Sequence, residues 1–206
     1  MAGPVFWAAE DTADVLRFYR DFIADAPDEL GTVIRLGTIP PLPGVGNEMH
    51  FRPAIAVASC YAGPVEAGER AVRALRQFGT PLVDLVGPTR YVDHQSGIDD
   101  TVPHGWRYYW KATNLTRLSD AVIDIVAEHA YRATSPRSYA AIFHLGGAVG
   151  RAPRGATAAD PERNVGHTMS IDAVWLRNRT TPSAQQRPHG HEHSSPPCSR
   201  TVPAST

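Results

Sequence analysis

The segment Trp106–Lys111, W-R-Y-Y-W-K, has the side chains best suited to binding a small polar molecule. Successive side chains of a strand point to opposite faces. One face would therefore carry three aromatic residues, Trp106, Tyr108 and Trp110. The other would carry Arg107, Tyr109 and Lys111. We expect the aromatic row to pack against helices and the polar row to form a binding surface. The alternative is that the polar row is only the solvated face of an antiparallel sheet.

Asp172 and His144 are candidates on two further strands. Asp172 lies within S-I-D-A-V-W, where a carboxylate is either on the wet face or a base with a raised pKa. His144 ends an apolar strand before Gly146-Gly147, a pair that permits positive φ or close approach to a ligand, or makes a simple turn. The stretch G-G-A-V-G lacks the spacing of a dinucleotide fingerprint, and we do not expect it to open a helix.

Gln95 and Asp99 lie in Y-V-D-H-Q-S-G-I-D-D, a short segment between two strands. Their side chains either cap a helix or contact a ligand. The order of the chain alone does not decide between these roles.

Other site chemistries find little support. H-G-H-E-H near the C-terminus places His189, His191 and His193 in a polar tail, where no second shell would orient them on a metal. Cys60 and Cys198 form no C-x-x-C pattern. We therefore expect no metal site, and the absence of G-x-S-x-G gives no support for a serine nucleophile.

Three helices must hold these strands in place. Apolar side chains recur at helical spacing over residues 11–26, 64–78 and 115–131. Pro27 ends the first helix, Gly79 follows the second, and Asn114 or Thr116 is expected to cap the third.

Seven segments have the composition of strands: residues 4–8, 32–39, 54–61, 81–86, 106–111, 139–145 and 168–175. With the helices they read β-α-β-β-α-β-β-α-β-β. This order predicts an α+β fold, a largely antiparallel sheet with helices packed on one face. The other face of the sheet is expected to remain free.

The composition is that of a globular domain of ordinary size. The 206 residues are 42% hydrophobic and 20% charged, with a formal net charge of −1, which argues against nucleic-acid and anionic-membrane partners. No apolar run reaches the length of a membrane span, and cytoplasmic residence is expected. Residues 2–176 should form the domain, and residues 177–206, rich in Pro, Ser, Thr and Arg, a disordered tail.

Several longer phrases resemble the substrate-binding domain of bacterial berberine-bridge-enzyme-like FAD-linked oxidases. They are E-A-G-E-R-A-V-R-A-L-R-Q-F-G-T-P-L-V-D-L-V-G-P-T-R-Y-V-D-H-Q (66–95), H-G-W-R-Y-Y-W-K (104–111), L-T-R-L-S-D (115–120), I-F-H-L-G-G-A-V-G-R (142–151) and S-I-D-A-V-W (170–175). The likeness extends over about residues 2–175 in order.

The resemblance implies a two-domain enzyme in which an N-terminal domain binds FAD. The second domain lays an antiparallel sheet over the isoalloxazine ring, and a small organic substrate binds between the two. A hydride passes to the flavin, which O₂ reoxidises. The free sheet face would then be the substrate face, with Arg107, Tyr109 and Lys111 as candidates. Gln95, His144 and Asp172 lie in similar phrases, and no catalytic residue is assigned.

The chain also departs from this family at both ends. It begins where a relative would have completed its flavin domain, and after Trp175 it lacks the family's closing helix and strand. We therefore expect an incomplete substrate domain that is inactive and retains no FAD alone. Its expected partners are a small-molecule substrate, a flavin domain supplied in trans, or further copies of itself, with Val174 on a free edge strand. The alternative is a stand-alone, non-catalytic binding or assembly module that uses the exposed sheet face.

Overall fold

A computed structural model of the chain describes residues 1–151 and 165–176. The tail expected to be disordered, residues 177–206, lies outside the described residues. Within the described ranges the strands are β1 (Ala2–Ala8), β2 (Leu30–Thr38), β3 (Pro53–Tyr61), β4 (Val83–Asp84), β5 (Arg107–Leu115), β6 (Tyr139–His144) and β7 (His167–Trp175). The helices are α1 (Thr12–Ala24), α2 (Val65–Gln77), α3 (Tyr91–Ser96), α4 (Asp120–His129) and α5 (Gly147–Arg151).

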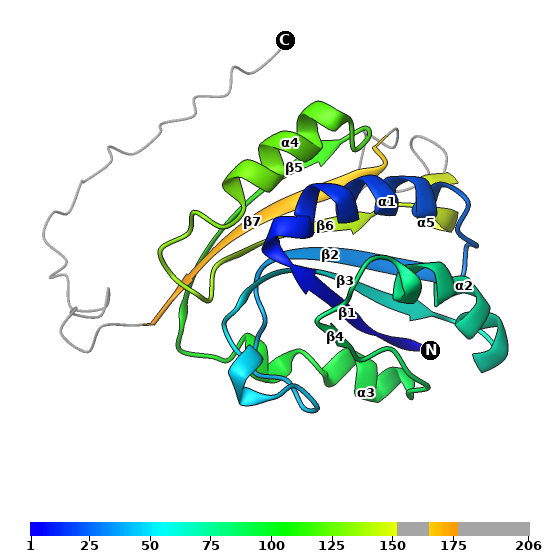
Figure 1. Cartoon of the computed structure of the whole chain (residues 1–206), viewed down its shortest axis with the longest axis horizontal. Coiled ribbons are helices and arrows are strands. Elements are labelled where there is room, and N and C mark those ends of the chain that lie inside the picture. Colours follow the sequence, from blue (N-terminus) through cyan, green and yellow to red (C-terminus); the bar gives the residue numbers. More distant parts are fainter. Residues whose placement is uncertain (152–164, 177–206) are drawn as a thin grey trace, which may run out of the picture. The chain divides into compact units, whose positions relative to one another are not determined.

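The described strands form one sheet in the order β4-β1-β3-β2-β6-β7-β5, and each pairing is antiparallel (Figure 1). The predicted α+β class is therefore confirmed. β5 is an outer strand, and β7 is paired on both sides. Val174 consequently does not lie on an edge as expected: it is 2% exposed, in the interior of the sheet.

One face of the sheet carries the main core, because three helices place apolar stripes on it. Val15, Tyr19 and Ile23 of α1 are buried at spacings of four residues, as the sequence predicted. Val72 and Leu75 of α2 and Ile123 and Val126 of α4 join them over a sheet surface that includes Trp7, Ile34, Ile55 and Ile142. None of the helices in the described ranges combines the length and apolarity needed to cross a bilayer.

The second face of the sheet is only partly free, which corrects the expectation. The loop after β2 packs Leu42, Val45 and Met49 onto a small apolar cluster of Phe6, Ile39, Ala54 and Ala56. This cluster covers the β1–β3 half of the face. The surface formed by β6, β7 and β5 on that side is the part we call the open face.

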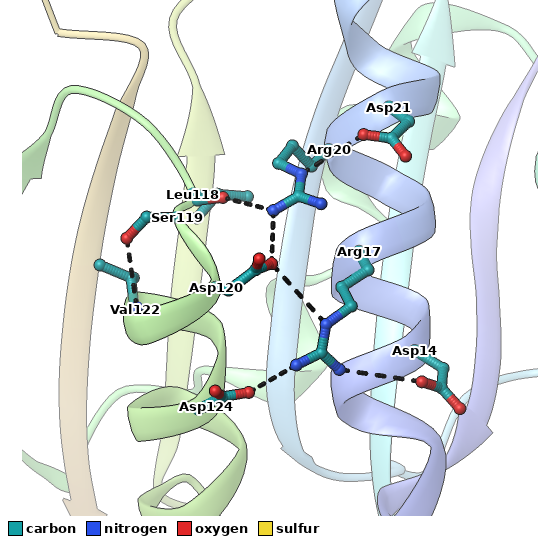
Figure 2. A network of polar contacts seen from close by, with 9 residues as sticks. All are labelled: Asp14, Arg17, Arg20, Asp21, Leu118, Ser119, Asp120, Val122 and Asp124. Carbon is teal, nitrogen blue, oxygen red and sulfur yellow. Dashed lines mark hydrogen bonds and ion pairs between the residues drawn. The ribbon is translucent and has the colours of Figure 1, made fainter.

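Polar contacts fix α4 beside α1 (Figure 2). Arg20 of α1 donates to Asp120 Oδ1 at 2.7 Å and to the carbonyl of Leu118 at 3.3 Å, and Arg17 donates to Asp124 at 2.6 Å. The Arg20 guanidinium lowers the pKa of Asp120. Because these side chains are largely exposed, each pair adds little stability, and the network chiefly fixes the position of the helix start.

The third predicted helix begins later than expected. Leu115 ends β5 instead, since Asn114 and Leu115 still pair with Thr168 and His167. Ser119 caps α4 by accepting from the backbone N–H of Val122. The short helices α3 and α5 were not predicted, and α5 shows that the glycine pair does open a helix, although one of only five residues.

Candidate functional site

The cross-strand register reverses the two faces expected for β5. Tyr109 pairs with Ala173 and Lys111 with Ile171, while Ile171 pairs with Ala140 on the other side. Paired residues share a face of the sheet, and Ala140 belongs to the helix-side core. The row Arg107, Tyr109 and Lys111 therefore lies on the helix side, and the aromatic row lies on the open face.

The reversal has a physical cause. Alternation tells which side chains share a face, but long-range pairing decides which face that is. Because β5 is outermost, neither of its rows is well buried: Tyr109 is 57% and Trp110 62% exposed.

A row of polar and aromatic side chains crosses four strands, from β5 over the open face to the neighbouring strand β2. Trp110 of β5 pairs with Asp172 of β7, and Asp172 pairs with Tyr139 of β6. Arg35 of β2 stacks on the Tyr139 ring, with its guanidinium carbon 4.5 Å from the ring centroid. We call Arg35, Tyr139, Asp172 and Trp110 the open-face row.

Asp172 is the buried acid of this row, with 4% of its surface exposed. Ser170 donates a hydrogen bond to its Oδ2. Burial raises the pKa of Asp172, while the Ser170 hydrogen bond and the charge of Arg35 act in the opposite direction. A carboxyl group held in this way is suited to accept a proton or a hydrogen bond from a ligand.

Arg35 and Tyr139 complete the electrostatics. Arg35 donates a hydrogen bond to the carbonyl of Thr38. Burial lowers the pKa of Arg35, while the interactions with Tyr139 and Asp172 act to raise it. Burial and then the Asp172 carboxylate raise the pKa of Tyr139. At neutral pH the row therefore presents a guanidinium, a neutral phenol and a carboxylate beside an exposed indole.

A second cation lies between aromatic rings near the start of β6. The Arg137 guanidinium carbon is 4.5 Å from the Trp106 ring centroid and 5.4 Å from that of Phe51. Phe51 has a φ of 61°, a left-handed conformation that is uncommon for a bulky residue. These contacts join the loop after β2 to the segment before β5.

The remaining predicted residues do not join the open-face row. His144 lies on the helix side, where it pairs with His167, and Gln95 is exposed in α3. Asp99 begins a short 3-10 helix, Asp99–Thr101, where it is exposed. Gly147 does adopt the positive φ, 60°, that the glycine pair allowed.

Sequence reasoning missed Arg35, Tyr139 and His167. A signal for Arg35 existed, because an arginine interrupts the apolar strand V-I-R-L and needs a special environment there. Tyr139 and His167 carried no comparable signal, since their roles depend on strands far away in the sequence.

The open face suits part of FAD, the cofactor that the sequence resemblance implies. Its surface beside the row includes Ala141 and Phe143 of β6, and Phe143 is 40% exposed, so a flat ring could lie against it. The described residues offer no glycine-rich loop leading into a long helix, which is the usual cradle of a diphosphate. The described residues thus fit the ring and not the diphosphate. They also contain no cluster of three or more metal-ligating side chains.

No protein-family model matches the chain. An FAD-linked oxidoreductase from Dictyostelium discoideum is 28% identical over 134 residues, which are 64% of this chain and 29% of that protein. The chain thus spans less than a third of this curated relative.

Solved structures of oxidases share the fold. 6-hydroxy-D-nicotine oxidase from Arthrobacter nicotinovorans superposes with a TM-score of 0.60 at 17% identity, over 91% of this chain and 40% of that one. A BBE-like protein from Arabidopsis thaliana gives 0.62 at 13% identity, over 84% and 37%. Glucooligosaccharide oxidase from Acremonium strictum, with a 6-S-cysteinyl, 8α-N1-histidyl FAD, gives 0.62 at 14% identity, over 89% and 41%. The resemblance to berberine-bridge-enzyme-like FAD-linked oxidases that the sequence indicated is thereby confirmed, in sequence by an FAD-linked oxidoreductase and in fold by these oxidases.

Proposed function

We propose that this chain is the substrate-binding portion of an FAD-dependent oxidoreductase. The enzyme would oxidise a small organic substrate by hydride transfer to flavin, with O₂ as the electron acceptor. The observation that carries the proposal is the open-face row, in which a buried carboxyl group lies among Arg35, Tyr139 and an exposed Trp110. Helices cover most of the opposite face, so we take this surface as the one that would meet a flavin.

The row also suggests how its members divide the work. Trp110 supplies a flat apolar surface for a ring or a carbon skeleton. Asp172 accepts a hydrogen bond or proton from the group being oxidised, and the nearby charge of Arg35 favours its carboxylate form. Asp172 is the one residue of the sequence-based candidates that remains on this face. We keep Gln95, His144, Arg107, Tyr109 and Lys111 as outlying candidates, all of which except Gln95 lie on the helix side.

A stand-alone assembly module is the second candidate function, and a groove on the helix side favours it. The groove lies between α4 and strands β6 and β7, with a volume of about 350 Å³ and an apolar lining that includes Val126, Met169 and Ile171. Ile171 is 57% exposed, and Tyr109 lies on the same side of the neighbouring edge strand. A partner chain could cover this surface.

The first prediction concerns FAD. The chain alone should elute colourless from gel filtration after incubation with FAD, because a ring-covering surface without a diphosphate cradle binds weakly. Absorbance at the flavin band measures the retained cofactor. A yellow protein with stoichiometric FAD would contradict the proposed division between two parts. A flavin domain supplied in trans should restore both colour and oxidase activity.

The second prediction concerns Asp172→Asn. The folded state raises the pKa of Asp172, so the folded chain keeps this proton to a higher pH than the unfolded chain does. Ionisation of Asp172 above its unfolded pKa therefore destabilises the fold. The substitution should raise the free energy of unfolding at pH 7 by on the order of 1 kcal/mol, and the gain should vanish below about pH 4. Denaturant unfolding at both pH values measures it.

Asp93→Asn serves as the matched control. Asp93 is a surface carboxylate in α3 that forms an ion pair with Arg90, the residue just before the helix. It should leave stability within about 0.5 kcal/mol of the unchanged chain. A loss of stability at pH 7 in Asp172→Asn would show that the carboxylate supports the fold instead of serving a ligand.

The third prediction concerns self-association, which we propose for the chain alone. Within the described part of the chain, β5 has no partner on its outer side, beside Tyr109 and Trp110, and such edges template further pairing. Light scattering of the unchanged chain should show oligomers. The substitution Ala112→Lys, in the edge strand β5, should reduce the fraction of oligomer. Gln95→Lys adds the same charge on α3 and should not. If the unchanged chain stayed monomeric at high concentration, self-association through the β5 edge would be contradicted.

A further inference from the structure

Two histidines face each other on the helix side, outside the open-face row. His144 ends β6 and His167 begins β7, and the two are directly opposite in the antiparallel ladder. Their ring centroids are 5.2 Å apart, with a tilt of 54° between the rings. Tyr19 of α1 closes one side, with its ring centroid 6.5 Å from that of His167.

The pair is buried without hydrogen-bond partners. His167 is 7% exposed, and both of its ring nitrogens lack a partner among the described residues. The same holds for His144 Nδ1. A buried nitrogen of this kind costs free energy unless something binds it, and native structures leave few such groups unexplained.

Nearby groups do not fill this role. The hydroxyl of Tyr19 is already hydrogen-bonded to Thr32 at 2.6 Å. Gly166 gives its carbonyl to the N–H of Leu145 at 2.9 Å, and the same backbone group also interacts with the His144 ring. Asp28, near the following turn, pairs with Arg151. Both ring nitrogens of His167 and Nδ1 of His144 therefore remain without a partner among the described residues.

We propose that His144 and His167 bind one divalent transition-metal ion of the Zn²⁺ type between β6 and β7. Water molecules would complete the coordination, since the described residues offer no third ligand of the usual kinds.

The geometry fits this class of ion. Zn²⁺ binds imidazole nitrogen at about 2.0–2.1 Å, so two rings on one tetrahedral ion have centroids roughly 5 Å apart. The observed separation of 5.2 Å matches that value. Zinc, copper and nickel ions all bind imidazole nitrogen, so the two histidines identify the class of ion and not the individual metal.

The turn after β6 leaves room for the site. A Cβ atom built on Gly146 would lie 2.1 Å from His144 Nε2, so any side chain at that position would displace the ring. Nδ1 is the ring nitrogen of His144 that is buried without a partner, and we take it as the one available to an ion. The site lies on the opposite side of the sheet from Asp172, so it stands or fails independently of the proposed oxidoreductase function.

Thermal unfolding with Zn²⁺ tests the proposal. The background is the full chain with His189, His191 and His193 changed to Ala, which removes the tail imidazoles that would bind zinc adventitiously. At 100 µM Zn²⁺ a site with a Kd near ~10 µM should raise Tm by about 3–5 °C, and EDTA should reverse the shift. His144→Gln and His167→Gln should each abolish the shift.

His129→Gln is the matched control, because His129 is exposed near the end of α4. It should keep the full shift in Tm. Ring ¹⁵N resonances of His144 and His167, but not of His129, should move on addition of zinc. If His167→Gln fails to fold, the Tm shift of His144→Gln and the ring ¹⁵N resonances of the background chain still test the proposal. No shift in the background chain, or a shift that survives His144→Gln, would overturn the proposal.

Discussion

The position of β7 between β6 and β5 is the constraint on which the rest of the structure depends. Antiparallel pairing on both sides fixes Asp172 opposite Tyr139 on one neighbour and opposite Trp110 on the other. The same register places Met169 and Ile171 on the helix side, and Met169 reaches the core. A shift of one residue would exchange the two faces, expose the core side chains and bury the open-face row against helices. The apolar residues of β7 therefore decide where its carboxylate lies.

The two faces of the sheet differ in what they do for the fold. The helix side holds the continuous core. Within it the Trp7 indole donates to the Phe78 carbonyl, and the Tyr19 hydroxyl shares a hydrogen bond with Thr32. The open face holds a carboxyl group at 4% exposure and a guanidinium that gains only part of its hydrogen bonds from the described residues. Buried charge of this kind contributes less to stability than apolar packing would. A ligand that uses this charge is the role we propose for it, in line with the resemblance to FAD-linked oxidases.

Much of the fold was predictable, because its signals are local. The stripes of α1 and α2, the seven strands and the antiparallel α+β class all follow from the spacing of apolar residues. The start of α4 was not, since the pairing of Leu115 with His167 extends β5 past the point where helical periodicity begins. The faces of β5 and the interior position of Val174 depend on strand order, which local patterns do not contain. For the same reason only Asp172 of the six candidate site residues was placed on the open face, and Arg35, Tyr139 and His167 appeared as neighbours only through the assembled sheet.

The central claim is that the surface around Trp110 and Asp172 is the one that meets a flavin. An NMR titration of the chain with FMN tests this most directly, because the ring is present and the weak affinity expected is measurable. If flavin lies on this surface, the Trp110 indole N–H and the Ser170 and Asp172 amides should show concentration-dependent shifts, while the buried Trp7 indole stays unchanged. Shifts confined to the helix-side residues Tyr109, Lys111 and Ile171, or no shifts at millimolar FMN, would contradict it.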